Sequence, residues 1–64
     1  MRFTFGQGVR VTEGFYKGQS GTIIDELYYT LFGNGEFEYK ISLEYPIGEI
    51  KTIQIPEKSL EKLK

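Results

Sequence analysis

The segment from residue 36 to residue 45 alternates strictly between polar and apolar side chains. Its apolar members are Phe37, Tyr39, Ile41, Leu43 and Tyr45. Successive side chains of a strand point to opposite faces of the sheet, so a period of two predicts a strand with one buried and one solvent-facing side. The ten residues therefore commit the chain to a β structure before any other part of it is considered.

Two shorter segments show the same period. Residues 9–12 alternate from Val9 and predict a first strand, which Phe3 and Phe5 extend upstream because they share its parity. Residues 52–55 predict a fourth strand. Pro56 ends that strand, because proline has no N–H to donate to a ladder.

The second strand is expected over residues 21–32, where the alternation breaks at Ile23-Ile24 and again at Tyr28-Tyr29. Such breaks indicate a bulge or a sharp bend. Gly33-Asn34-Gly35 and Pro46-Ile47-Gly48 are expected to turn the chain before and after the third strand. The tail, residues 57–64, fits either a helical turn or a turn followed by a short closing strand.

Four or five short antiparallel strands joined by tight turns predict a single domain over residues 1–64. Closing these strands into a small SH3-like barrel leaves few sheet edges exposed, so we expect that all-β fold. The expected core consists of Val9, Val11, Ile23, Phe37, Tyr39, Ile41, Leu43, Ile53, Ile55 and Leu60.

The chain has 64 residues with no Cys and no His. Disulfides, thiolate zinc sites and imidazole ligands are therefore excluded, and no serine has a His to activate it. We expect no catalytic residue, no metal and no cofactor, and hence a binding module rather than an enzyme. No apolar run reaches the length of a membrane span and the start lacks the apolar core of a signal peptide, so a cytoplasmic location without membrane contact is expected.

The stretch from Gly8 to Asp25 resembles the KOW motif of some ribosomal proteins and NusG-type transcription factors. The shared features are a Val-x-Val strand, glycines at Gly14, Gly18 and Gly21, and an aromatic residue, Tyr16, next to a lysine. Phe15 stands where the family often has proline. The resemblance implies a barrel fold, and KOW domains as a class bind both RNA and protein.

Charge is segregated along the chain. Residues 25–49 carry one Lys against six acidic residues, a net charge of −5, whereas residues 1–24 and 50–64 each carry a net charge of +2. Phosphate neutralisation dominates nucleic-acid affinity, so the acidic middle favours a protein partner over RNA or DNA.

The candidate binding surface combines exposed rings with cations in the first loop and on the strand before it, and its residues are Arg10, Phe15, Tyr16, Lys17 and Gln19. Tyr28-Tyr29 is a second candidate, because adjacent strand residues cannot both face inward unless a bulge intervenes. Rings beside cations stack bases and neutralise phosphate, and they also anchor protein interfaces. Either Phe15 or Tyr16 has the alternative of folding back onto the core. Protein docking is the favoured function; the alternatives are RNA or DNA binding and a small accessory or inhibitory protein of a virus or mobile element. The oligomeric state is open.

Overall fold

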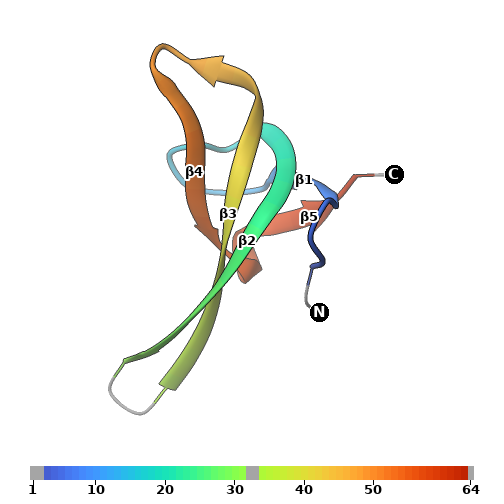
Figure 1. Ribbon diagram of the computed structural model, residues 1–64. Coiled ribbons are helices and arrows are strands. Elements are labelled where there is room, and N and C mark those ends of the chain that lie inside the picture. Colours follow the sequence, from blue (N-terminus) through green and yellow to red (C-terminus); the bar gives the residue numbers. More distant parts are fainter. Residues whose placement is uncertain (1–2, 32–33, 64) are drawn as a thin grey trace.

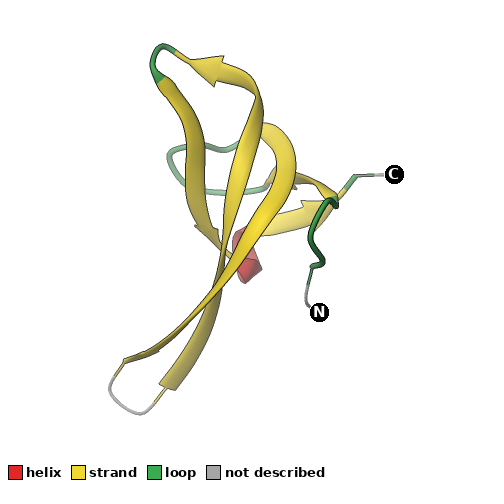
Figure 2. Cartoon of the chain, in the orientation of Figure 1, coloured by secondary structure: helices red, strands yellow, loops and turns green. Residues whose placement is uncertain are grey.

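The computed structural model describes residues 3–31 and 34–63, and for residues 28–31 and 34–36 it describes the backbone alone. This part of the chain forms five antiparallel strands and one short 3-10 turn (Figures 1 and 2). They are β1 (Gly8–Val11), β2 (Ser20–Leu31), β3 (Asn34–Ile47), β4 (Ile50–Pro56), η1 (Glu57–Ser59) and β5 (Leu60–Lys62). The order across the sheet is β4-β3-β2-β1-β5. The predicted all-β, SH3-like barrel class is confirmed.

The strand β2 belongs to both halves of the barrel. Its first residues, from Ser20 to Thr22, pair with β1, and from Gly21 onward it also pairs with β3. The register with β3 shifts between Ile23 and Asp25, so Ile24 forms a bulge. A bulge bends a strand and increases its twist, and β2 curves over the barrel in Figure 1. The predicted break at Ile23-Ile24 is therefore confirmed as a bulge.

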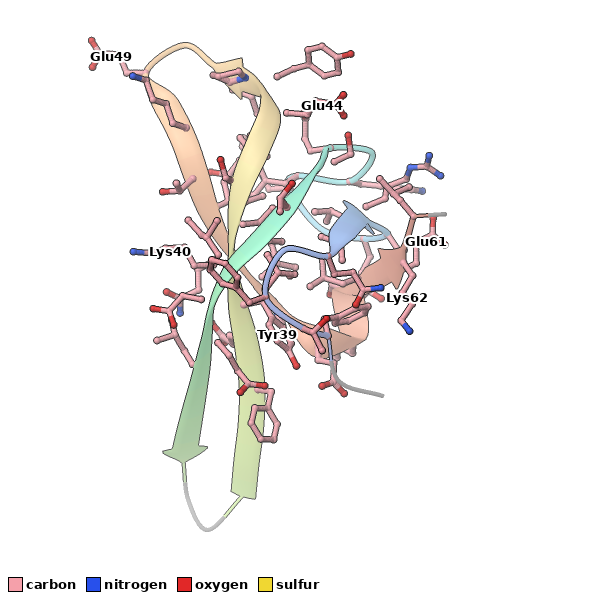
Figure 3. The ribbon with its side chains drawn as sticks, turned by 45° about the vertical axis from the view of Figure 1, so that its right-hand side comes forward. Tyr39, Lys40, Glu44, Glu49, Glu61 and Lys62 are labelled. Atoms are coloured by element: carbon pink, nitrogen blue, oxygen red, sulfur yellow. The ribbon has the colours of Figure 1, made fainter. Side chains whose placement is uncertain are left out.

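The core follows from strand register. Ile23 of β2 lies opposite Ile41 of β3, and Ile41 lies opposite Ile53 of β4, so three isoleucines meet on the inner face. Every predicted core residue is buried except Phe37, which is half-buried and packs against the cluster. Tyr39 and Lys40 are neighbours on β3 and point to opposite sides of the strand, as the alternation requires (Figure 3).

The expected upstream extension of the first strand is wrong. A turn at Phe5 and Gly6 precedes β1, and Gly6 has a φ of 87°. Phe3 is consequently free to enter the core, where its ring meets Tyr39 edge-on at 5.5 Å. Phe5 lies 80% exposed. By alternation alone, Phe3 and Phe5 would lie on the same face of a strand. The turn at Phe5 and Gly6 instead leaves Phe3 in the core and Phe5 at the surface.

The turn before β4 lies later than expected. β3 includes Pro46 and Ile47, Ile47 pairs with Ile50, and Gly48-Glu49 alone makes the turn. The β3–β4 register is irregular between Ser42 and Ile47. Tyr45, which the alternation placed with the buried set, is 70% exposed for this reason.

Three other expectations concern residues 28–35 and the tail. Pairing is regular at Tyr28-Tyr29, so the second break in the alternation is not a bulge. The predicted turn at Gly33-Asn34-Gly35 lies partly outside the described residues, with Asn34 already in β3. In the tail, the turn followed by a closing strand is the correct alternative, because η1 leads into β5 and β5 pairs with β1.

We expect Ile41→Ala to lower the free energy of unfolding by about 2–5 kcal/mol, because the side chain is 1% exposed at the centre of the core. Its neighbour Lys40 is exposed, so Lys40→Ala should change stability by no more than about 0.5 kcal/mol. Urea denaturation of both variants measures the difference. Equal, mild effects would show that the register of β3 is wrong.

We expect Gly21→Ala to destabilise the barrel, because a methyl group there would collide with the carbonyl oxygen of Ser42 and with Ile41 Cγ2. Overpacking of this kind costs about 1–3 kcal/mol. Gly8→Ala is the matched control, since the nearest atom to its added methyl is Leu63 Cβ at 3.7 Å. Thermal denaturation should leave the control unchanged or slightly more stable, and two equal effects would contradict the close approach of β2 to β3.

Candidate functional site

The first loop, residues 12–19, connects β1 to β2 and is held at its base by backbone hydrogen bonds. Gly18 N–H donates to Val11 O at 2.8 Å, and Thr12 N–H donates to Ser59 O at 2.8 Å. Two tight turns follow each other within the loop, with Lys17 N–H bonded to Gly14 O and Gln19 N–H bonded to Tyr16 O. The loop is therefore tied both to its own strand and to η1.

Glycines allow the loop to take this path. Gly14 and Gly18 each have a φ of 92°, a conformation that residues with a Cβ adopt only with strain. The third motif glycine, Gly21, has a different role, the close approach to β3 described above. Of the three motif glycines, Gly14 and Gly18 thus adopt a positive φ, and Gly21 allows close backbone contact with β3.

Phe15 and Tyr16 are neighbours with opposite environments. Phe15 is 92% exposed at the surface of the loop. Tyr16 is half-buried and packs against the core. The two rings meet edge-on at 5.0 Å with an interplanar angle of 89°. Tyr16 is thus the ring that folds back onto the core, and it supports the exposed Phe15 from beneath.

The cations of the predicted surface have carboxylates near them in space or in sequence. Arg10 Nη1 lies 3.3 Å from Glu61 Oε2 on the adjacent β5, and both side chains are about half exposed. Lys17 is exposed and shares its loop with the exposed Glu13. Gln19 is half-buried and adds no charge. The surface is therefore aromatic and close to neutral rather than strongly basic.

Tyr28 and Tyr29, the second candidate, are separate from this surface. They lie on the portion of β2 that extends away from the first loop with β3 (Figure 1). Their side chains are outside the described part of the structure. The predicted site residues therefore fall into two separate groups, one on the loop side of the barrel and one on the extended hairpin.

A partly buried polar cluster joins the N-terminal segment to the barrel. The hydroxyl of Tyr39 accepts a hydrogen bond from Phe3 N–H at 3.1 Å and lies 3.2 Å from Glu26 Oε2 and 3.3 Å from Glu57 Oε1. The Tyr39 side chain is 0% exposed, so its hydroxyl needs these partners. The cluster connects four segments of the chain and is part of the architecture. A groove beside it is lined by Phe3, Thr4, Phe5, Ile23, Ile24, Asp25 and Glu26.

Sequence reasoning missed an apolar patch at the tip of the β3–β4 hairpin. Tyr45, Ile47 and Ile50 are all exposed there, on either side of the turn. Glu49 projects from the turn itself (Figure 3). The signal was present in the sequence, since Ile47 and Ile50 flank the two turn residues, but the turn was expected earlier, at Pro46-Ile47-Gly48, and the alternation grouped Tyr45 with the apolar face of its strand.

Comparison with protein-family models, curated proteins and solved structures finds no match to this chain. Across residues 3–31 and 34–63, no three acidic side chains gather into a set that would hold a metal ion. The same residues contain no helix of the length and apolarity that crossing a bilayer takes. The KOW resemblance therefore remains an expectation from the sequence.

We expect Tyr16→Ala to lower the free energy of unfolding by about 1–3 kcal/mol, because it removes a ring packed on the core. Phe15→Ala should change it by no more than about 0.5 kcal/mol, because that ring is almost fully exposed. Chemical denaturation of the two variants compares adjacent residues of the same loop. A larger loss from the Phe15 variant would contradict these two environments.

Proposed function

We propose that this chain is a non-catalytic binding module that docks a protein partner through the first loop, with Phe15 as the anchor. The observation that carries the proposal is the 92% exposure of this ring on a loop tied down by backbone hydrogen bonds. Burying a Phe side chain contributes about 1.5–3 kcal/mol, which this fold leaves unused. That contribution is available to an interface.

Preorganisation strengthens the case for an anchor. Binding is weaker when side chains and loops must become ordered, because they lose conformational entropy. A rigid aromatic residue loses little of it. Tyr16 packs between the core and Phe15. The backbone at and after Phe15 is held by the two turns over residues 14–17 and 16–19. A partner with an apolar pocket would therefore meet the ring in one orientation.

Charge supports a protein rather than a nucleic acid as the partner. Arg10 pairs with Glu61, which leaves Lys17 as the exposed cation of the described loop. Nucleic-acid affinity at physiological salt rests on several phosphate contacts. A single loop cation, with Glu13 close by in sequence, supplies few such phosphate contacts.

Nucleic-acid binding is the second candidate, and the adjacency of Phe15 and Lys17 favours it. A solvent-facing ring can stack on a base while the neighbouring ammonium neutralises a phosphate. In this second candidate function Phe15, rather than Tyr16, would be the stacking residue, because its ring is exposed. The KOW resemblance points in the same direction.

We expect Phe15→Ala to weaken the complex with the partner recovered from a lysate by at least about tenfold, the effect of losing an anchor of 1.4 kcal/mol or more. Phe5→Ala is the matched control, because Phe5 is also an exposed ring but lies outside the loop. Affinity is measured against ionic strength, with and without nuclease. Equal binding by the two variants would show that the loop is not the docking surface.

The salt dependence separates the two candidates. For a protein partner, affinity should fall only modestly with salt, and nuclease should have no effect. For a nucleic acid, nuclease should abolish recovery and Lys17→Ala should lower the salt slope by about one unit. That second result would replace protein docking with nucleic-acid binding.

A further inference from the structure

The hairpin of β2 and β3 extends beyond the barrel as a two-stranded arm, here defined as residues 27–31 with residues 34–38. Its ladder is regular from Leu27, opposite Glu38, to Leu31, opposite Asn34. The strand β4 reaches this arm only where Pro56 pairs with Glu38. Figure 1 shows the arm leaving the rest of the molecule as a narrow ribbon. A ribbon of two strands is marginal in water, and a third strand or a packed face is needed for independent stability.

One edge of the arm lacks a neighbour in the described chain. The strand β1 pairs with β2 only from Gly8, opposite Thr22, to Arg10, opposite Ser20. From the described part of the N-terminal segment, residues 3–7, backbone hydrogen bonds reach β2 only at Ile23. Within residues 3–31 and 34–63, no strand pairs with residues 27–31 on the side away from β3. An open edge of this kind presents a row of backbone donors and acceptors.

The other sheet edges carry the features with which proteins discourage edge pairing. The strand β4 contains Lys51 and ends in Pro56, and β5 is only three residues long, two of them charged. The arm's other strand carries Glu36 and Glu38. Residues 27–31, by contrast, read Leu-Tyr-Tyr-Thr-Leu, without a charge, a proline or a glycine. This is the composition of a strand that pairs with another strand.

We infer that a second copy of this chain pairs with residues 27–31, antiparallel, about a two-fold axis at Tyr29. In that register Leu27 lies opposite Leu31 of the second copy, Tyr28 lies opposite Thr30, and Tyr29 lies opposite itself. Each is an apolar, aromatic or β-branched pair, the classes that stabilise neighbouring strands. Because the interface is isologous, it closes after two copies and gives a four-stranded ribbon.

Charge selects the antiparallel arrangement of the two copies. Glu26 precedes the open segment, and a parallel pairing in register would place the two Glu26 residues side by side. In the antiparallel register they are six positions apart, a separation of about 20 Å along the strand. That exceeds the screening length of about 8 Å at physiological ionic strength. Residues 27–31 can therefore pair favourably with the same residues of another copy. For this reason we assign the open edge to a second copy of this chain rather than to a different protein.

The dimer does not rest on the docking function proposed for Phe15. The arm runs away from the first loop, so pairing of the arms leaves both loops accessible (Figure 1). A dimer would present two copies of the loop, and two linked sites bind a divalent partner more tightly than one site does.

Sedimentation equilibrium of the full chain over micromolar to millimolar concentrations tests the inference. We expect the unaltered chain to dimerise and Tyr29→Lys to raise the dissociation constant by at least about tenfold, because two lysines would face each other on the two-fold axis. The control is Thr52→Lys, which adds the same charge at an exposed position of β4. It should dimerise like the unaltered chain.

Mixing Tyr29→Lys with Tyr29→Glu should restore association as a heterodimer, since opposite charges then meet at the axis. Recovery by mixing also shows that each variant retains its arm. Amide hydrogen exchange supplies a second measurement, in which residues 27–31 of the unaltered chain gain protection as concentration rises. A chain that stays monomeric at millimolar concentration, or a dimer that Tyr29→Lys leaves intact, would overturn the assignment.

Discussion

The strand β2 pairs with β1 near its start and with β3 along its length, and the bulge at Ile24 allows it to do both. This 64-residue chain has no cysteine, and its described part encloses its core with a single five-stranded sheet, which requires one strand to turn through the corner. The bulge supplies that corner, and Gly21 lets the backbone of β2 approach Ser42 closely. Ile23, Ile41 and Ile53 lie side by side across three strands, directly before this bend. The two ends of the sheet are then joined through η1 and β5.

Tyr39 connects the segment before β1 to this core through its contacts with Phe3. Among the side chains that the structure describes it is the largest fully buried one, and its hydroxyl is the polar group around which Phe3, Glu26 and Glu57 assemble. Burial of an unpaired hydroxyl would destabilise the core, whereas a satisfied one holds its partners in position. Phe3 thereby joins the core although it belongs to no strand. The same arrangement keeps the segment before β1 close to the bulge.

Alternation in the sequence predicted burial correctly where one face of a strand packs on the core. It predicted burial wrongly where the strand leaves the core or ends in a turn. Burial enforces a period of two on β3, so Tyr39, Ile41 and Leu43 were assigned correctly from alternation alone. Past Leu43 the pairing with β4 becomes irregular, and the exposed Tyr45 has the parity of a core residue without its environment. Phe3 and Phe5 fail for a related reason, because parity cannot detect the turn at Gly6 between them.

The candidate site was less predictable because a loop has no period. Nothing in the order Phe15-Tyr16 indicates which ring is buried, and backbone turns decide it by directing Tyr16 toward the core. The pairing of Arg10 with Glu61 joins residues from opposite ends of the chain and depends on β1 lying beside β5.

The division between Phe15 and Tyr16 also limits what the loop can do. A ring that supports the fold cannot leave its position to meet a partner without losing the contacts that stabilise the barrel. Tyr16 is such a ring, so in the docking function proposed above the contacts with a partner would fall on its exposed neighbours, Phe15 and Lys17. Because the loop is tied to Val11 and to Ser59, a partner would bind a surface already formed in the free chain. Affinity would then come from fitting the Phe15 ring rather than from ordering the loop.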